Sequence, residues 1–266
     1  MFIRSTILLP ALLLALWPQA RAATPPALSQ AWEDAALNLT REAHRSFAAL
    51  DGREARFGEA VTMLQLQPKT DPNIERAANL LEEVVAERAD DELGIAARFY
   101  LGRLEQVHRT PLNPEAAAEH FAVLLRDFPG HPLTEQAVVK LALLELYAPG
   151  TPAEQLAAFE KFRRLGEELK THDAIRDLNL TLGNAAQRLA LGDELALPCY
   201  IAAYRAGIHL TSVRGDTLVS IGELARKTGR HELAREHYQR FLEEFKRDNR
   251  RLTIRERLDS LPAPRP

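Results

Sequence analysis

The stretch EAAAEHFAVLLRDFPGHP, residues 115–132, begins with helix-forming residues and ends in a Pro-Gly-His-Pro breaker. Its apolar residues Ala117, Phe121 and Leu124 are spaced four and three apart, which places them on one face of an α-helix. The helix should end at the breaker because proline lacks an amide donor and glycine has low helix propensity. The stretch therefore predicts one amphipathic helix followed by a sharp turn.

The same apolar pattern recurs along the chain: an alanine, a ring or leucine four residues on, and an apolar residue three further. The sets are Ala77/Leu81/Val84, Ala117/Phe121/Leu124, Ala158/Phe162/Leu165, Ala196/Tyr200/Ala203 and Ala234/Tyr238/Phe241. Their alanines are 40, 41, 38 and 38 residues apart. Such regular spacing indicates a repeat protein.

A second helical segment precedes each copy and carries a small residue at a comparable place. These residues are Gly58, Gly102, Ala142, Gly183 and Gly222. A small side chain there lets the two helices of a hairpin approach closely. The segments are separated by the breakers TDPN (70–73), TPLNP (110–114), APGTP (148–152), LGDE (191–194) and TGRH (228–231). The unit is therefore a helix–turn–helix, and stacked hairpins of this kind share one continuous core.

The segment LVSIGELARKTGRHELAREHYQRFLEEFKRD, residues 218–248, resembles a tetratricopeptide repeat along its whole length. The signature places are occupied by Leu218, Ile221, Gly222, Ala225, Ala234, Tyr238 and Phe241. YLGRLEQVHRTPLNPEAAAEHFAVLLRDFPGHP, residues 100–132, resembles it too. The resemblance covers about residues 50–248 and is loosest in the fourth copy, where Pro198 is expected to interrupt the second helix. It implies an all-α, right-handed superhelical solenoid of about five helix hairpins.

Both ends of the repeat domain, residues 51–248, need polar caps. Residues 23–50 are predicted as an N-terminal cap, in which 29–50 form one amphipathic helix. Its apolar side would hold Trp32, Ala36, Leu39, Ala43 and Phe47. Residues 249–266 are predicted as a C-terminal capping helix and tail, begun by Asn249. Its residues Ile254, Leu258 and Leu261 would cover the last repeat.

The first 22 residues are typical of a cleaved signal peptide. Arg4 precedes the apolar core ILLPALLLALW, and the segment ends in Ala20-Arg21-Ala22, a small-x-small pattern. The apolar run is short for a permanent anchor, which remains the alternative interpretation. No apolar run of membrane-spanning length follows, so we expect a periplasmic or secreted protein without stable membrane insertion. Without residues 1–22 the chain keeps 32 basic and 37 acidic side chains, a balance that does not favour nucleic-acid binding.

The sequence contains few patterns typical of catalytic or metal-binding sites, and we predict that the protein is not an enzyme and has no cofactor and no metal site. Its eight histidines do not cluster, and it has no HExxH, CxxC, GxSxG or phosphate-loop motif. Cys199, the only cysteine, is interpreted as a buried thiol beside Tyr200. The acidic residues Glu82, Glu83, Glu87, Asp90, Asp91 and Glu92 alternate with apolar ones, which favours a solvated helix face over a cation site.

In tetratricopeptide-repeat proteins the first helix of each hairpin lines a concave groove. The resemblance thereby implies partner-binding places for Phe99, Arg103, Gln106, Leu180, Asn184, Gln187, Arg188, Glu223, Arg226 and Lys227. The alternative is ordinary surface, with Phe99 and Leu180 partly packed between repeats. The family's clamp for a peptide carboxylate needs a Lys and two Asn. Only Asn184 matches it, and Asp216 stands where the Lys is wanted.

The leading hypothesis is a non-enzymatic extracytoplasmic adaptor that binds an extended or helical segment of a protein partner in this groove. HFAVLLRDFPGHPLTEQAVVKLALLEL (120–146) resembles repeats of bacterial envelope proteins such as the Tol-Pal coordinator, which suggests a role in cell-envelope assembly or maintenance. One alternative is a peptidoglycan- or glycan-associated enzyme subunit, which would need a pair of carboxylates facing a cleft. Another is self-assembly into a homo-oligomer through repeats that stack between chains.

Overall fold

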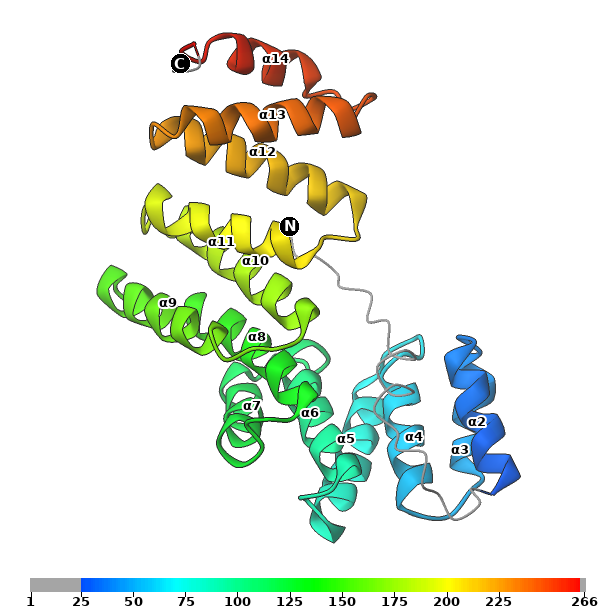
Figure 1. The fold of residues 1–266 in the computed structure, drawn as a ribbon. Helices are drawn as coiled ribbons and strands as arrows, with labels where there is room; N and C mark the ends of the chain where they lie inside the picture. Colours follow the sequence, from blue (N-terminus) through cyan, green and yellow to red (C-terminus); the bar gives the residue numbers. More distant parts are fainter. Residues whose placement is uncertain (1–24, 264–266) are drawn as a thin grey trace. The chain divides into compact units, whose positions relative to one another are not determined.

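The computed structural model describes residues 25–263, which form thirteen α-helices and no strand. The helices, labelled as in Figure 1, are α2 (Pro26–Ala36), α3 (Thr40–Ala48), α4 (Arg53–Met63), α5 (Asp71–Glu87), α6 (Glu92–Val107), α7 (Pro114–Asp127), α8 (Pro132–Leu146), α9 (Pro152–Gly166), α10 (His172–Arg188), α11 (Asp193–Ala206), α12 (Thr211–Lys227), α13 (His231–Glu244) and α14 (Arg251–Asp259). The expected all-α fold is confirmed. The signal sequence expected at residues 1–22 lies outside the described residues.

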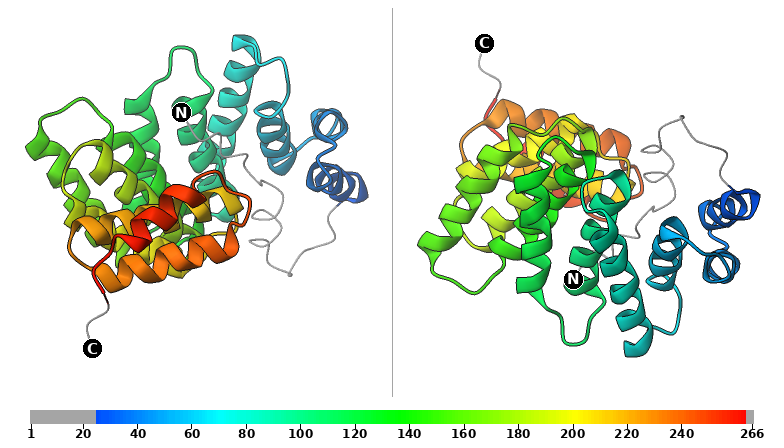
Figure 2. Two further views of the ribbon diagram at one scale, coloured as in Figure 1. Left: turned by 90° about the horizontal axis from the view of Figure 1, so that it is seen from above. Right: turned by 90° about the horizontal axis from the view of Figure 1, so that it is seen from below.

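Consecutive helices pair into hairpins, and the hairpins divide between two compact units. Within the described residues, 25–127 form one unit with the hairpins α2–α3, α4–α5 and α6–α7. Residues 128–263 form the other, with α8–α9, α10–α11, α12–α13 and the final helix α14. Figure 2 shows the paired helices from two further directions. The breakers found in the sequence lie between the helices of the five predicted repeats.

Three of the hairpin glycines, Gly102, Gly183 and Gly222, face aromatic rings on the second helix of their own hairpin. A Cβ added at Gly102 would lie 2.7 Å from the Phe121 ring, one at Gly183 3.1 Å from Tyr200, and one at Gly222 2.6 Å from Tyr238 Cδ1. Carbon atoms in ordinary contact are about 3.5–4.0 Å apart. Each glycine therefore makes room for a ring, and the ring fills the space between the paired helices.

The first unit begins with a hairpin where one helix was expected. The chain breaks at Leu37–Leu39, between α2 and α3, and Asn38 adopts a left-handed conformation with φ 59°. Asn tolerates this conformation better than most residues do. The hairpin packs Trp32 edge-on against Phe47, with ring centroids 4.7 Å apart. The prediction of a single helix over 29–50 is therefore wrong, and Leu39, expected on the apolar side, is 44% exposed.

The third repeat differs from the predicted register, and the fourth differs from the predicted helix interruption. In α9 the fully buried rings belong to Phe159 and Phe162, whereas Ala158 and Leu165 of the expected set are only partly buried. Phe162 is buried as predicted, and one further ring, Phe159, fills the core in place of Ala158 and Leu165. Pro198 does not interrupt α11, which runs from Asp193 to Ala206 with the exposed proline inside it. The proline removes one intrahelical hydrogen bond and crowds the carbonyl of Glu194, but it lies near the start of α11, and the helix continues past it.

Contacts with different chemistry join the first helices of successive hairpins. In one unit Arg53 of α4 donates to both carboxylate oxygens of Asp91, the N-cap of α6, at 2.6 and 2.9 Å. In the other, Glu135 of α8 accepts from the backbone N–H and hydroxyl of Thr171, the N-cap of α10, at 2.8 and 2.6 Å. Burial opposes the charge on Asp91, but the bonds to Arg53 and Gly94 outweigh it and lower the pKa of its carboxyl.

The C-terminal helix α14 begins differently from the prediction: its N-cap residue is Arg250, and no side chain caps it. Asn249 is exposed, and the side chain that accepts the Arg250 backbone N–H, at 2.9 Å, is Asp248. Arg250 also forms an ion pair with Asp216 of α12 at 2.7 Å. Ile254 is buried as expected and packs α14 onto the last repeat.

Candidate functional site

The first helices of the hairpins form the inner side of each unit. The pairs α2–α4 and α4–α6 are in contact in one unit, and α8–α10 in the other. No two second helices make comparable contact within residues 25–263. At these pairs the first helices lie closer together than the second helices do, whereas α12 contacts α11 and α13 rather than α10. The positions one, four and five residues after the hairpin glycine are called the inner-face positions below.

In α10 the inner-face positions are Asn184, Gln187 and Arg188, all exposed. The Tyr200 hydroxyl of α11 reaches them, 2.7 Å from Asn184 Oδ1 and 2.8 Å from Gln187 Oε1. Burial of the Tyr200 ring raises the pKa of its hydroxyl, which therefore stays protonated. Ring packing against Gly183 thus places one hydroxyl between two surface amides.

The next hairpin repeats this arrangement 39 residues later, with a carboxylate in place of an amide. Glu223, Arg226 and Lys227 hold the inner-face positions of α12, and the Tyr238 hydroxyl of α13 donates to Glu223. Glu223 also pairs with Arg226 at 3.2 Å and with Arg257 of α14 at 2.7 Å. The hydrogen bond from Arg226 to Glu223 raises the pKa of the Arg226 guanidinium, which stays charged.

The cations expected along the groove differ in how far they are already paired. Arg188 lies over the Tyr147 ring, 5.5 Å from its centroid, and has no carboxylate partner within residues 25–263. Lys227 lies 3.7 Å from Asp193 and keeps a 51% exposed side chain. Arg226 is already ion-paired with Glu223. The second unit therefore offers two accessible cations on this face, Arg188 and Lys227.

Tyr147 was not among the residues predicted for the inner face, although its position in the repeat indicates that it belongs there. It lies five residues after Ala142, the residue that replaces the hairpin glycine in α8, which is the inner-face position equivalent to Arg188 and Lys227. Tyr147 as a whole is 36% exposed. Stacking between Tyr147 and Arg188 therefore joins equivalent positions of two successive hairpins.

In the first unit, the hairpin α6–α7 has the same contact of a glycine with a ring, but the ring belongs to a phenylalanine. Phe121 packs on Gly102 and has no hydroxyl, and Arg103 instead donates to Gln106 at 2.5 Å. Phe99 is half-buried, and its ring centroid lies 5.8 Å from that of Phe121 in the same hairpin. Burial lowers the pKa of Arg103. This inner face is therefore more apolar and less charged than that of the second unit.

Other sequence candidates have structural partners. Cys199 is buried, and its burial raises the pKa of the thiol to about 11, which makes it a poor nucleophile. The acidic residues Glu83 and Glu87 of α5 are exposed and pair with Arg56 of α4. Asp216, at the place of the clamp lysine, is paired with Arg250.

The described residues contain no group of three or more His, Cys, Asp or Glu side chains arranged to hold a metal ion. Among the helices of residues 25–263, none has the length and apolar character needed to cross a membrane.

No protein-family model and no curated protein matches the sequence. Solved structures do. PilF of Pseudomonas aeruginosa has a TM-score of 0.57 at 13% identity, over 87% of this chain and 96% of that one. A chain of the APC/C hetero-tetramer Cut9–Hcn1 has a TM-score of 0.51 at 14% identity, over 87% of this chain and 42% of that one. A tetratricopeptide-repeat protein of Thermus thermophilus, TTC0263, has a TM-score of 0.42 at 17% identity, over 79% and 98%.

At these identities the likeness shows the fold. The chain has the tetratricopeptide-repeat fold, as the repeat pattern predicted.

Proposed function

We propose that the protein is a non-enzymatic scaffold that binds an extended segment of a partner protein on the inner face of its second unit. The tetratricopeptide-repeat fold supports this role, since such hairpins present long surfaces made for peptide segments. The observation that carries the proposal is the pair of tyrosine-backed polar clusters on α10 and α12, around Tyr200 and Tyr238.

These clusters suit a peptide backbone. The Tyr200 hydroxyl has one proton, so it donates to either Asn184 Oδ1 or Gln187 Oε1 and keeps both amides near one fixed point. The remaining donors and acceptors of the amides face solvent, where an extended peptide presents alternating N–H and C=O groups. Fixed amides lose less side-chain entropy on binding than free ones, which favours association.

The charges on this face favour a partner segment that carries carboxylates. Arg188 and Lys227 are exposed and lie on neighbouring hairpins, at equivalent inner-face positions. An exposed ion pair contributes only ~0.2–1 kcal/mol, and salt screens it. We therefore expect modest affinity that falls with ionic strength, and specificity that depends on the amides and on Tyr147.

The finer assignment is an exported protein that acts in the bacterial cell envelope. The charged, apolar and small-x-small segments of residues 1–22 support export, and the repeat at 120–146 resembles those of envelope proteins. N-terminal sequencing of the exported protein should begin at Ala23. A sequence that begins at Met1 would contradict cleavage and leave an anchored scaffold.

Crosslinking in the native envelope tests the binding face. A photoreactive amino acid at Gln187, on α10, should capture a partner, whereas the same group at Arg164, on the second helix α9, should capture little. The double substitution Arg188→Ala with Lys227→Ala should reduce capture and its salt dependence.

The matched control is Arg163→Ala with Arg164→Ala, which removes the same charge from exposed positions of α9. Equal loss of capture in both pairs would contradict a specific inner-face site. Equal capture from positions 187 and 164 would do so too.

A further inference from the structure

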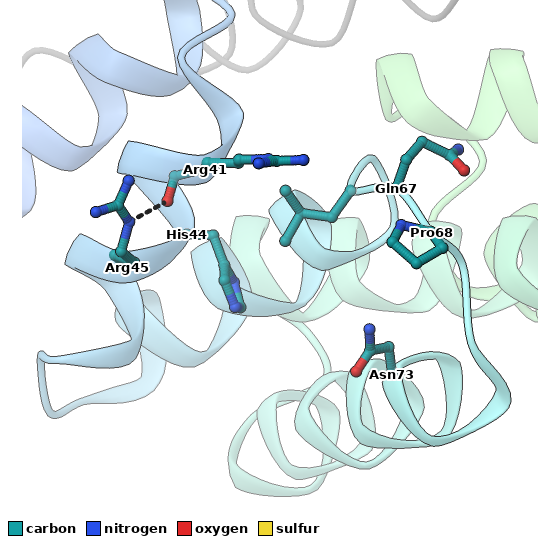
Figure 3. Close-up of a pocket in the computed structure, with 7 residues that line it drawn as sticks. Arg41, His44, Arg45, Gln67, Pro68 and Asn73 are labelled. Carbon is teal, nitrogen blue, oxygen red and sulfur yellow. Dashed lines mark hydrogen bonds between the residues drawn. The ribbon is translucent and has the colours of Figure 1, made fainter.

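A small pocket lies in the first unit, between α3, the loop after α4 and the first turn of α5 (Figure 3). Its volume is about 270 Å³, room for a side-chain-sized group rather than for a whole cofactor. The lining residues are Arg41, His44, Arg45, Leu66, Gln67, Pro68 and Asn73. None of them is acidic.

Arg41 and His44 supply the basic wall. They are three residues apart on α3 and so share one face of that helix. Figure 3 shows the Arg41 guanidinium extended across the pocket, toward Gln67. Within residues 25–263 it has no carboxylate partner, although Arg45, one turn further on, pairs with Glu42 at 3.3 Å.

Arg45 lines the same pocket but turns away from it. Its Nε donates to the Arg41 carbonyl oxygen at 3.3 Å, and Figure 3 shows its guanidinium on the far side of the helix backbone from Pro68. Two arginines of one helix therefore differ in role: Arg41 is open to a ligand, and Arg45 is held by its own helix.

The opposite wall combines an amide with apolar surface. The side chain of Asn73 offers N–H donors on this wall, Leu66 and Pro68 line it with carbon surface, and the Gln67 amide points away from Arg41 in Figure 3. An inorganic anion would leave this carbon surface unused. A carboxylate on an aliphatic stem would place its oxygens at Arg41, in the planar geometry that a guanidinium prefers, and its stem against Leu66.

We propose that this pocket binds a carboxylate carried on a short aliphatic stem, as an acidic residue of a partner polypeptide presents it. The site goes beyond the inner-face proposal. It is built from α3 and α5, the second helices of their hairpins, and none of its residues holds an inner-face position. The protein thereby gains a contact point for an acidic segment on its outer side.

The test is a titration of the full mature chain, followed by the backbone NMR signals of α3 and of residues 64–73. The probes are acetyl-Ala-Glu-Ala-amide, the same peptide with Gln in place of Glu, and inorganic phosphate. We expect saturable shifts with the Glu peptide, and about two- to five-fold weaker binding of the Gln peptide, which lacks the charge that pairs with Arg41. Phosphate should bind more weakly than the Glu peptide because it cannot use Leu66 and Pro68.

Variants separate the pocket from general charge attraction. Arg41→Gln should weaken binding of the Glu peptide about two- to five-fold, the range expected for one exposed ion pair. Arg45→Gln removes the same charge from the same helix and should leave binding nearly unchanged. Equal effects of the two substitutions, or equal binding of phosphate or of the Gln peptide, would overturn the proposal.

The inner-face variant Arg188→Ala with Lys227→Ala should bind the Glu peptide here as the unmodified protein does. Loss of binding in that variant would place the peptide on the inner face and overturn the pocket. Failure of the envelope crosslinking would leave this titration unaffected.

Discussion

Gly222→Ala should destabilise the protein although alanine is the better helix former. The new methyl group would lie 2.6 Å from Tyr238 Cδ1, roughly 1 Å closer than an ordinary carbon contact. Overpacking of this kind costs ~1–3 kcal/mol. We expect the upper half of that range because Tyr238 is fully buried and its hydroxyl is bonded to Glu223, so the ring cannot easily turn away. The gain in helix propensity offsets ~1 kcal/mol, which leaves a net loss of ~1–2 kcal/mol.

The assay is urea denaturation followed by circular dichroism, with two comparisons. Gly183→Ala meets Tyr200 at 3.1 Å, so the ring need give way by only a few tenths of an ångström, and its net effect should be near zero. In a Tyr238→Leu background, Gly222→Ala should instead stabilise by about 1 kcal/mol because the obstructing ring is gone. Stabilisation by Gly222→Ala in the otherwise unmodified protein would refute the reasoning. It would show that the Tyr238 ring can pack against α12 without a glycine at position 222.

Three further predictions concern buried groups. Ala117→Leu and Ala234→Leu should each destabilise by ~1–3 kcal/mol in urea unfolding, since both alanines are fully buried; unchanged stability in both would contradict the repeat register. His108 should titrate near pH 4 by NMR, because burial, and to a lesser extent Lys69 and Arg103, lower the pKa of its imidazole. This pKa lies below that of the unfolded chain, so the stability it contributes is full above about pH 6.5 and is lost as the pH falls toward 4; His108→Gln should remove that part of the pH dependence. The Cys199 thiol should react with a thiol reagent at neutral pH only after unfolding, and rapid reaction of the native protein would contradict its burial.

The repeat architecture could be predicted because its signals are local. The alanine–ring spacing, the hairpin glycines and the prolines at helix starts act within one hairpin of about 38 residues, so each copy carries its own evidence. The five predicted hairpins were found where the breakers placed them. The all-α fold followed from residues such as Gly222 and Tyr238, which must meet for the two helices to pack.

The N-terminal hairpin could not be predicted in this way. The spacing of Trp32, Leu39, Ala43 and Phe47 suits one continuous helix, and no proline or glycine marks the break. The chain nevertheless turns at Asn38, which brings Trp32 onto Phe47 and encloses Phe47 against Gly58 of the next hairpin. Burial of two large aromatic rings outweighs the few helical hydrogen bonds that the turn removes.

The candidate sites likewise depend partly on the sequence pattern and partly on the tertiary structure. The residues Asn184, Gln187 and Arg188 follow from counting along the repeat, but their partners do not. Counting cannot show that the Tyr200 hydroxyl lies within hydrogen-bond distance of the first two or that Tyr147 stacks on the third. The pocket beside Arg41 is formed by α3, the loop after α4 and the first turn of α5. No repeated spacing in the sequence links these three segments. Spacing along a helix determines which side chains share a face. Only the packing of helix on helix determines what each of those side chains meets, because that contact depends on distances between elements that no local sequence encodes.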